Sequence, residues 1–177
     1  LALLAAEKFK TADLPFPVVA ITGTNGKTTI TYLFEHLYQA REKRAGIMGT
    51  VSYRWPGHAE AAPLTTPDAL SVHAMLAAMA KAGVDVAVME VSSHAIDQQR
   101  VCGVPFSGAA FTNLTQDHLD YHKSMESYFQ VKARLFLELP RPDKAMAVNA
   151  DDPWGRRLLE LCPTALSFGL QKGALNK

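Results

Sequence analysis

One short segment limits the fold of this chain more than any other feature. Val18–Thr22 is apolar and mostly β-branched, which is typical of a buried strand. Gly23 follows it directly, and from Lys27 onward apolar residues recur at helical spacing. The sequence therefore predicts a strand, a glycine turn and a helix in immediate succession, which is the first half of an α/β unit.

Further apolar runs alternate with stretches of helical periodicity. We expect strands at 45–48, 84–91, 108–114, 145–149 and 165–168, and helices at 67–82 and 125–139. This alternation predicts an α/β fold with a mostly parallel sheet flanked by helices on both faces. Residues 53–67 contain three prolines and one glycine, so we expect a surface loop there. Ligands of such sheets bind beyond the carboxyl ends of the strands.

The glycine turn has the ending of a phosphate-binding loop and opens a helix. Glycines let backbone N–H groups turn toward phosphate oxygens, and the helix N-terminus adds partial positive charge. Lys27 would bridge the outer phosphates, and the Thr28 hydroxyl would ligate Mg²⁺. The usual pattern has a glycine five residues before the Gly-Lys pair. That position is Ile21 here, so the loop is a variant. The residues expected to hold the nucleotide are Gly23, Thr24, Asn25, Gly26, Lys27, Thr28 and Thr29.

Three more side chains follow or lie near the predicted strand ends. Glu90 ends a predicted central strand, where phosphate-loop enzymes place a second carboxylate directed at Mg²⁺. His118 follows the next strand and emerges at the same edge, although taken alone such a histidine is more often a polar loop residue. Lys132 lies in a helix with a clear apolar face, and its periodicity predicts a surface lysine.

Charge and composition exclude several classes of function. Lys and Arg number 18 against 17 Asp and Glu, so a net charge of +1 gives no field to attract nucleic acid or an anionic membrane. No apolar run approaches the roughly 20 residues of a membrane span. The two cysteines lack metal-ligand spacing, which fits a reducing cytoplasm. The length of 177 residues suits one domain.

Three strings together resemble the Mur ligase family: TGTNGKTT at 22–29, EVSSH at 90–94 and NLTQDHLDYH at 113–122. With LTTP at 64–67, they are most similar to the MurE branch of that family. The match runs from about residue 18 to 168. The resemblance implies a phosphate-loop NTPase-like central domain at 18–177. It also implies that 1–17 is a linker remnant from a missing N-terminal domain, and that a C-terminal domain is absent.

The resemblance also implies a reaction. ATP would phosphorylate the D-glutamyl carboxylate of UDP-MurNAc-L-Ala-D-Glu, and the amine of a diamino acid would attack the acyl phosphate. A carboxylate becomes an acylating agent only when one of its oxygens leaves as phosphate. The product would be a cytoplasmic precursor of peptidoglycan, and the diamino acid would be meso-diaminopimelate or L-lysine. We expect a monomer, and we expect this central part alone to be inactive in ligation.

Site residues are carried over from the family by position. Catalytic roles would fall on Lys27, His118 and Lys132, and Asn149 would lie near the adenine. Lys132 would be carbamylated, which converts a cation into an anion able to help hold a second Mg²⁺. Metal ligands would be Thr28, Glu90, His118 and Lys132. Substrate contacts would be Thr65, Thr66, Ser92, Gln98 and Arg100. Leu64 stands where some members have Asn, which removes one expected substrate contact.

Three other functions remain open on the sequence. A folylpolyglutamate synthase-like ligase would use the same activation on folate, although the strings at 92–94 and 117–122 suit the MurE branch better. A GTP switch protein also has a loop ending in Gly-Lys-Thr, but no Asn-Lys-x-Asp guanine-reading string occurs in the chain. The third alternative is a nucleotide-binding module without catalysis of its own.

Overall fold

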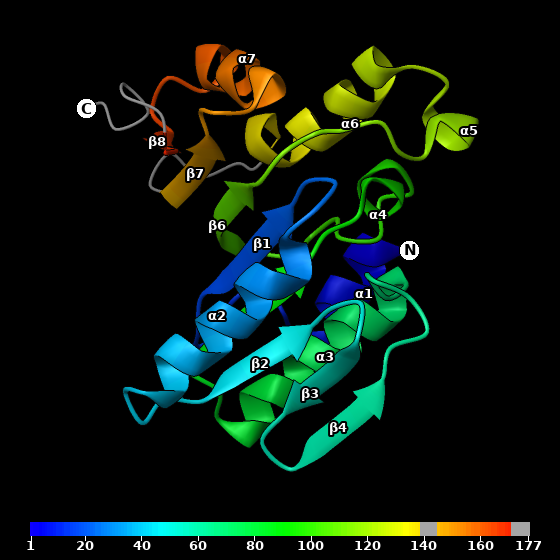
Figure 1. Cartoon of the computed structure of the whole chain (residues 1–177). Helices are drawn as coiled ribbons and strands as arrows, with labels where there is room; N and C mark the ends of the chain where they lie inside the picture. Colours follow the sequence, from blue (N-terminus) through cyan, green and yellow to red (C-terminus); the bar gives the residue numbers. More distant parts are fainter. Residues whose placement is uncertain (139–144, 171–177) are drawn as a thin grey trace.

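The computed structural model describes residues 1–138 and 145–170 of the chain (Figure 1). Within them one sheet has the strand order β4-β3-β2-β5-β1-β6-β7-β8. Strands β2, β5, β1, β6, β7 and β8 are parallel, whereas β3 and β4 form an antiparallel extension at one edge. The strands are β1 (Val18–Thr22), β2 (Ala45–Met48), β3 (Ser52–Trp55), β4 (His58–Ala61), β5 (Val86–Glu90), β6 (Phe106–Phe111), β7 (Ala145–Asn149) and β8 (Leu166–Phe168).

Helices cover both faces of this sheet, as the sequence predicts. The helices are α1 (Ala2–Phe9), α2 (Lys27–Gln39), α3 (Ala69–Ala82), α4 (Ser93–Asp97), α5 (Leu119–His122), α6 (Met125–Leu137) and α7 (Pro153–Leu161). Val18 and Ala20 of β1 face the core that α3, α6 and α7 cover, whereas Ile21 faces α2. The expected α/β architecture is therefore confirmed.

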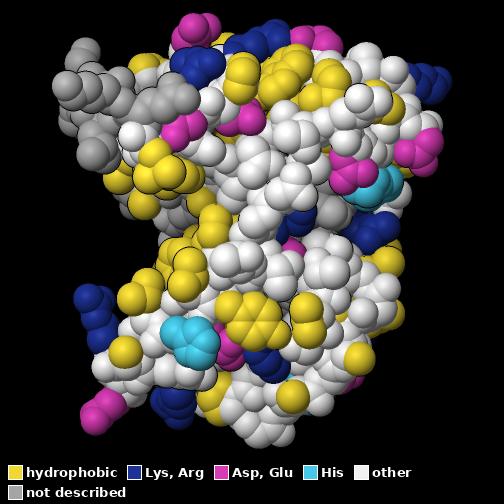
Figure 2. Space-filling view, viewed as in Figure 1, with side chains coloured by type: hydrophobic (Ala, Val, Ile, Leu, Met, Phe, Trp, Pro, Cys, Tyr) yellow, Lys and Arg dark blue, Asp and Glu magenta, His cyan; other side chains and the backbone are white. Residues whose placement is uncertain are grey.

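Helix α2 is amphipathic and packs on its own face of the sheet through Ile30, Phe34 and Tyr38. Figure 2 shows hydrophobic side chains along its outward side, where Leu33 and Leu37 are more than half exposed at 56% and 61%. Across the described ranges 1–138 and 145–170, no helix is both long and apolar enough to cross a bilayer.

Strand β5 lies at the centre of the sheet and is buried along its whole length. Ala87 and Met89 contribute to the larger core cluster, whereas Val86 and Val88 contribute to the cluster under α2. A strand buried on both faces reads as a continuous apolar run, which explains why the sequence predicts it. The strand ends at Glu90 and so delivers a carboxylate to the carboxyl edge of the sheet.

The expectation of a surface loop at 53–67 is wrong for its first part. Strands β3 and β4 form a hairpin there, joined by Pro56 and Gly57, and Gly57 has a φ of 81°. A Pro-Gly pair supplies the fixed and the positive φ that a tight turn needs. On α2, Glu35 accepts two hydrogen bonds from Arg54 and so fastens the hairpin to the sheet.

The N-terminal segment is folded onto the body of the protein. Helix α1 packs against α3, and the chain then leads through Phe16 into β1. The Thr11 hydroxyl lies 2.6 Å from Nδ1 of His73, whose Nε2 lies 3.1 Å from the carbonyl oxygen of Cys102. Burial lowers the pKa of His73 below the usual value for histidine. One neutral imidazole thus joins α1, α3 and the segment before β6.

Candidate active site

The phosphate loop connects β1 to α2 at the carboxyl edge of the sheet. Gly23 and Gly26 have φ values of 139° and 86°, which non-glycine residues rarely adopt. Gly26 precedes α2 and offers no side chain to cap it, so the first N–H groups of the helix remain available for an anion. The Lys27 ammonium donates to the carbonyl oxygens of Gly23 and Thr24 at 3.0 and 2.9 Å.

Residues after β6 hold this loop in place. The Thr112 hydroxyl donates to the carbonyl oxygen of Asn25 at 2.6 Å. The Asn113 side chain accepts from Asn25 N at 3.0 Å and donates to its carbonyl oxygen at 3.2 Å. A Cβ on Gly23 would lie 1.9 Å from Oγ1 of Thr112, so only glycine fits there. Neither Thr112 nor Asn113 is among the expected site residues; the available signals are their place at the end of a predicted strand and, for Asn113, its position in the string 113–122.

Two of the predicted metal ligands are in direct contact. The Thr28 hydroxyl donates to Oε2 of Glu90 at 2.9 Å. Glu90 is only 1% exposed, although it lies at the edge of the sheet. A Cβ on Gly49 would lie 2.3 Å from Oε1 of Glu90, so the carboxylate packs against that backbone. The side chains expected at 28 and 90 are therefore brought together.

Lys132 is buried, and the expectation of a surface lysine is wrong. It is 1% exposed, because α6 places it against the underside of the phosphate loop. Its ammonium donates to the carbonyl oxygen of Gly23 at 3.1 Å and lies 4.9 Å from the ring centroid of Tyr128. Burial holds the pKa of Lys132 well below its usual range, and the positive charge of Lys27 lowers it further. Burial also lowers the pKa of Lys27, against which Glu90 acts in the opposite direction.

His118 completes the group on its exposed side. It precedes α5 with a φ of 53°, and its Nε2 lies 3.4 Å from Oδ2 of Asp117. Its ring centroid lies 4.9 Å from that of His94 and 6.2 Å from that of Tyr128. Tyr128 thus contacts both Lys132 and His118. The four residues expected around the metal belong to two adjoining sets of contacts at the phosphate loop, and they are not scattered.

The ligand set suits magnesium in a nucleotide complex. Within residues 1–138 and 145–170, no three His, Cys, Asp or Glu side chains form a metal cage. Mg²⁺ bound to nucleotides usually takes one or two protein oxygens and completes its shell with phosphates and water. The contacting oxygens of Thr28 and Glu90 fit that pattern. A site of this kind needs no second acidic side chain.

The hydroxyls predicted to contact substrate are largely used inside the protein. Thr66 is 1% exposed, and its hydroxyl donates to the carbonyl oxygen of Glu90 at 2.8 Å. Oγ of Ser92 accepts from Ala95 N at 3.2 Å and so caps α4. Thr65 is partly exposed. These residues hold the wall beside Glu90, and Thr65 is the member of the three whose hydroxyl is not committed to a main-chain group.

Gln98 and Arg100 form a second group of predicted substrate residues. Arg100 donates twice to Oε1 of Gln98, at 2.9 and 2.5 Å, and once to the carbonyl oxygen of Thr66 at 3.1 Å. Both side chains line a hollow of about 320 Å³ that also includes Asp68 and Leu1. Arg100 thus connects this hollow to the wall that carries Glu90.

Asn149 lies close to the phosphate loop but is engaged by its neighbours. Its Nδ2 donates to the carbonyl oxygen of Thr112 at 2.8 Å, and its Oδ1 accepts from Asp151 N at 3.0 Å. Thr112 in turn holds Asn25. The side chain therefore braces the loop, and its contact with adenine stays a prediction.

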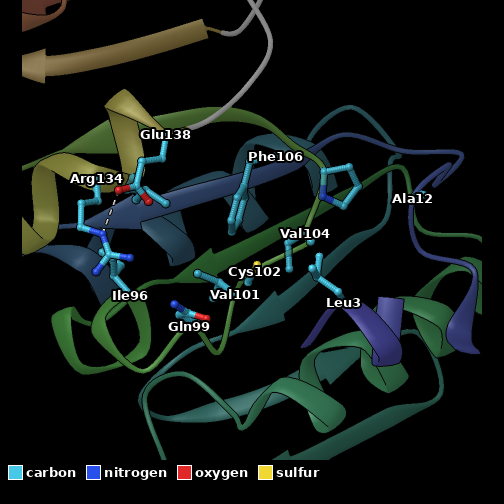
Figure 3. A pocket seen from close by; sticks show the side chains of 13 residues that line it. Leu3, Ala12, Ile96, Gln99, Val101, Cys102, Val104, Phe106, Arg134 and Glu138 are labelled. Carbon is cyan, nitrogen blue, oxygen red and sulfur yellow. Dashed lines mark hydrogen bonds and ion pairs between the residues drawn. The ribbon is translucent and has the colours of Figure 1, made fainter. Parts of the chain in front are cut away.

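A larger pocket of about 550 Å³ lies away from this chemistry (Figure 3). It is lined by Leu3 of α1, by Gln99 and residues 101–106, and by the end of α6, and none of the predicted site residues lines it. Apolar side chains such as Val104 and Phe106 contribute most of its wall. The pair Arg134 and Glu138, 3.0 Å apart, is drawn at one end of it in Figure 3.

Comparison with known proteins agrees with these observations. One curated relative is UDP-N-acetylmuramoyl-L-alanyl-D-glutamate--2,6-diaminopimelate ligase from Lawsonia intracellularis. It is 53% identical over 168 residues, which are 95% of this chain and 35% of that protein. The chain thus spans about a third of the length of the curated relatives it matches.

Solved structures agree with the sequence comparison. A structure described as the same kind of ligase superposes with a TM-score of 0.79 at 33% identity, covering 91% of this chain and 33% of that one. Mycobacterium tuberculosis folylpolyglutamate synthase has a TM-score of 0.69 over 97% of this chain and 48% of that one. At 18% identity that likeness shows the fold alone. Residues 21–177 match the family described as the Mur ligase middle domain. The chain belongs to the Mur ligase family.

Proposed function

We propose that this chain is the ATP-binding part of an ADP-forming amide ligase of peptidoglycan precursor synthesis. Its substrates would be UDP-MurNAc-L-Ala-D-Glu, ATP and a diamino acid, either meso-diaminopimelate or L-lysine. The observation that carries this proposal is the convergence of Lys27, Thr28, Glu90 and Lys132 on one phosphate loop. The relative from Lawsonia intracellularis is named for the diaminopimelate reaction, which favours that acid.

The residues would divide the work as follows. Lys27 and the N-terminus of α2 would hold the outer phosphates and offset the negative charge of the transferred phosphoryl group. Thr28 and Glu90 would hold Mg²⁺, with His118 beside them. When bound, Mg²⁺ supplies charge neutralisation of the phosphate oxygens. The acyl phosphate would form at the same edge of the sheet, where Arg100 offers donors for a carboxylate and Thr65 would contact the dipeptide.

Lys132 would act after modification by carbon dioxide. Its neutral nitrogen would bond to the carbon of CO₂ and release one proton, which leaves a carbamate anion. The lowered pKa of Lys132 supports this step, because only the neutral amine is nucleophilic. The carbamate would carry oxygens where a second Mg²⁺ needs them. Two magnesium ions and a carbamylated lysine are thus parts of the proposal.

The remaining assignments concern the whole enzyme. We propose that residues 1–17 lead from an N-terminal domain, that 18–177 form the central domain, and that a C-terminal domain completes the active site. The enzyme would act in the cytoplasm as a monomer. Asn149 would lie near the adenine, and Thr66, Ser92 and Gln98 would border the muramyl dipeptide.

Binding of ATP to the chain with and without Mg²⁺ tests the proposal. We expect Mg²⁺-dependent binding in the wild type and an affinity about 10- to 100-fold lower in Lys27→Ala, because a hydrogen bond to a charged group is lost. Lys43→Ala, which changes an exposed lysine after α2, serves as the control and should bind normally. Equal affinity in all three proteins would refute the assignment.

A further inference from the structure

Thr50 follows β2 and lies at the carboxyl edge of the sheet, beside the end of β5. Its main-chain N–H donates to Oε1 of Glu90 at 3.1 Å. Its hydroxyl lies 2.9 Å from Oε2 of the same carboxylate and 3.1 Å from the hydroxyl of Thr65. One residue therefore contacts both oxygens of a predicted metal ligand and a predicted substrate residue. Thr50 lies in none of the sequence motifs described above.

The chemistry of these groups sets the direction of the hydrogen bonds. A carboxylate only accepts, and a threonine hydroxyl has a single proton to donate. The proton of Thr50 therefore points to Glu90, and the hydroxyl of Thr65 is left to donate to the oxygen of Thr50. The three side chains form one directed chain from Thr65 through Thr50 to Glu90.

Thr50 provides most of the hydrogen bonding that orients Glu90. The carboxylate accepts from the Thr28 hydroxyl and from two groups of Thr50. Glu90 is 1% exposed, so water has little access to replace these donors. Gly49 lies directly behind Oε1, where even a methyl group would collide with it. The segment 49–50 thus fixes the rotation of the carboxylate. Thr28 contacts only Oε2, which also accepts from the Thr50 hydroxyl.

We propose that Thr50 is a positioning residue for magnesium, which aims Glu90 and links its orientation to Thr65. The inference rests on the proposed function, because it assumes that Glu90 serves a nucleotide-bound Mg²⁺. Partners of this kind that orient a metal ligand typically change metal affinity by 10- to 100-fold when they are removed. Thr50 also lies between the residue expected to touch the dipeptide and the residue expected to touch the metal. Movement of Thr65 would therefore change the orientation of the Glu90 carboxylate through Thr50.

A titration of Mg²⁺ tests this role in the whole chain. Binding of adenylyl imidodiphosphate is measured at increasing Mg²⁺ for the wild type, Thr50→Val and Thr50→Ser. We expect Thr50→Val to raise the Mg²⁺ concentration at half-maximal binding about 10-fold, because it removes the hydroxyl and keeps the shape. Thr50→Ser retains the hydroxyl and should behave as the wild type. Thr164→Val, at an exposed threonine far along the chain, is the matched control.

Binding in the absence of Mg²⁺ separates positioning from general damage. We expect all four proteins to bind the nucleotide equally without the metal. An equal loss with and without Mg²⁺ in Thr50→Val would overturn the inference in favour of a purely structural role. An unchanged Mg²⁺ midpoint in Thr50→Val would also overturn it. If the wild type itself showed no Mg²⁺-dependent binding, the proposed function would fail first, and the two failures are therefore distinguishable.

A double-variant cycle tests the link to Thr65. We expect Thr65→Val alone to raise the Mg²⁺ midpoint by less than Thr50→Val does, because it acts only through Thr50. In the Thr50→Val background the same change should have no further effect. If the fold-changes in the Mg²⁺ midpoint of the two single variants simply multiplied in the double variant, Thr50 and Thr65 would act independently, and the proposed link would be refuted.

Discussion

Lys27 and Lys132 both donate to the carbonyl oxygen of Gly23, at distances of 3.0 and 3.1 Å. The two ammonium groups thus share one acceptor beneath the phosphate loop. Positive charges on two such neighbours oppose each other, and buried Lys132, not partly exposed Lys27, is the lysine whose pKa is lowered well below its usual range. Burial and the neighbouring charge therefore favour loss of a proton from Lys132 over loss from Lys27.

We predict that ¹³C-labelled bicarbonate gives a carbamate resonance in the wild type and none in Lys132→Met. The neutral amine is the reacting species, so the signal should weaken as pH falls and Lys132 takes up a proton. Lys81→Met removes an exposed lysine at the end of α3 and should leave the resonance intact. A wild-type spectrum without the resonance at alkaline pH would contradict carbamylation.

Glu90→Gln should reduce Mg²⁺-dependent nucleotide binding by about 10- to 100-fold, because an amide is a weaker metal ligand and carries no charge. Nucleotide binding without Mg²⁺ should change little. Isothermal titration with and without the metal measures both quantities. Glu7→Gln, at an exposed position on α1, provides the charge-matched control. A loss confined to the Mg²⁺-free measurement would argue against a metal role for Glu90.

Gly23→Ala should abolish detectable nucleotide binding and destabilise the fold by about 1–3 kcal/mol through backbone strain, with a collision in addition. The collision is with Thr112, whose Oγ1 would lie 1.9 Å from the new Cβ. Gly57→Ala is the informative control, since Gly57 has a φ of 81° and open space around it. It should cost about 1 kcal/mol and leave affinity unchanged. Urea unfolding and ATP titration of both variants distinguish strain from collision.

Stability should fall as pH decreases from 7.5 toward 5.5. Burial lowers the pKa of His73 in the folded state, so the unfolded chain binds protons at a pH where the native protein does not. The contribution of His73 is therefore complete above about pH 6.5, the ordinary histidine pKa, and is lost as pH falls through its lower folded pKa. His94 and His122 act in the same direction, because burial lowers the pKa of each.

Urea unfolding at both pH values measures this effect. In His73→Gln the glutamine can still donate to Cys102 and accept from Thr11, so the fold should survive. The difference in the free energy of unfolding between pH 7.5 and 5.5 should shrink in this variant. A pH dependence identical to that of the wild type would remove His73 as its source.

Much of the sheet could be predicted because buried parallel strands consist of continuous runs of apolar residues. β1, β2 and β7 have the predicted bounds, and β5 and β6 differ only at their ends. The hairpin of β3 and β4 does not show in the sequence because most residues of these two strands are partly or fully exposed, so they form no apolar run. Helices α4 and α5 are too short to show periodicity.

Several of the expected site residues lie together at the phosphate loop, but the sequence did not indicate how deeply each is buried. Periodicity assigns a residue to a face of its helix, and it placed Lys132 on the wrong one because the phosphate loop, not solvent, covers that side of α6. The roles of Thr50, Thr112 and Asn113 depend on contacts between segments distant in the sequence, which no local pattern encodes. Lys27, Glu90 and His118 could be identified because each lies at or soon after the end of a recognisable strand.

The attachment of Asn25 to the end of β6 has a thermodynamic consequence. Because the carbonyl and N–H groups of Asn25 are already paired, the loop would have few conformations to give up when a polyphosphate binds. Its backbone entropy is lost during folding, not at the moment of association. The cradle is thus preorganised, and the affinity of phosphate contacts is not offset by ordering of the loop that makes them.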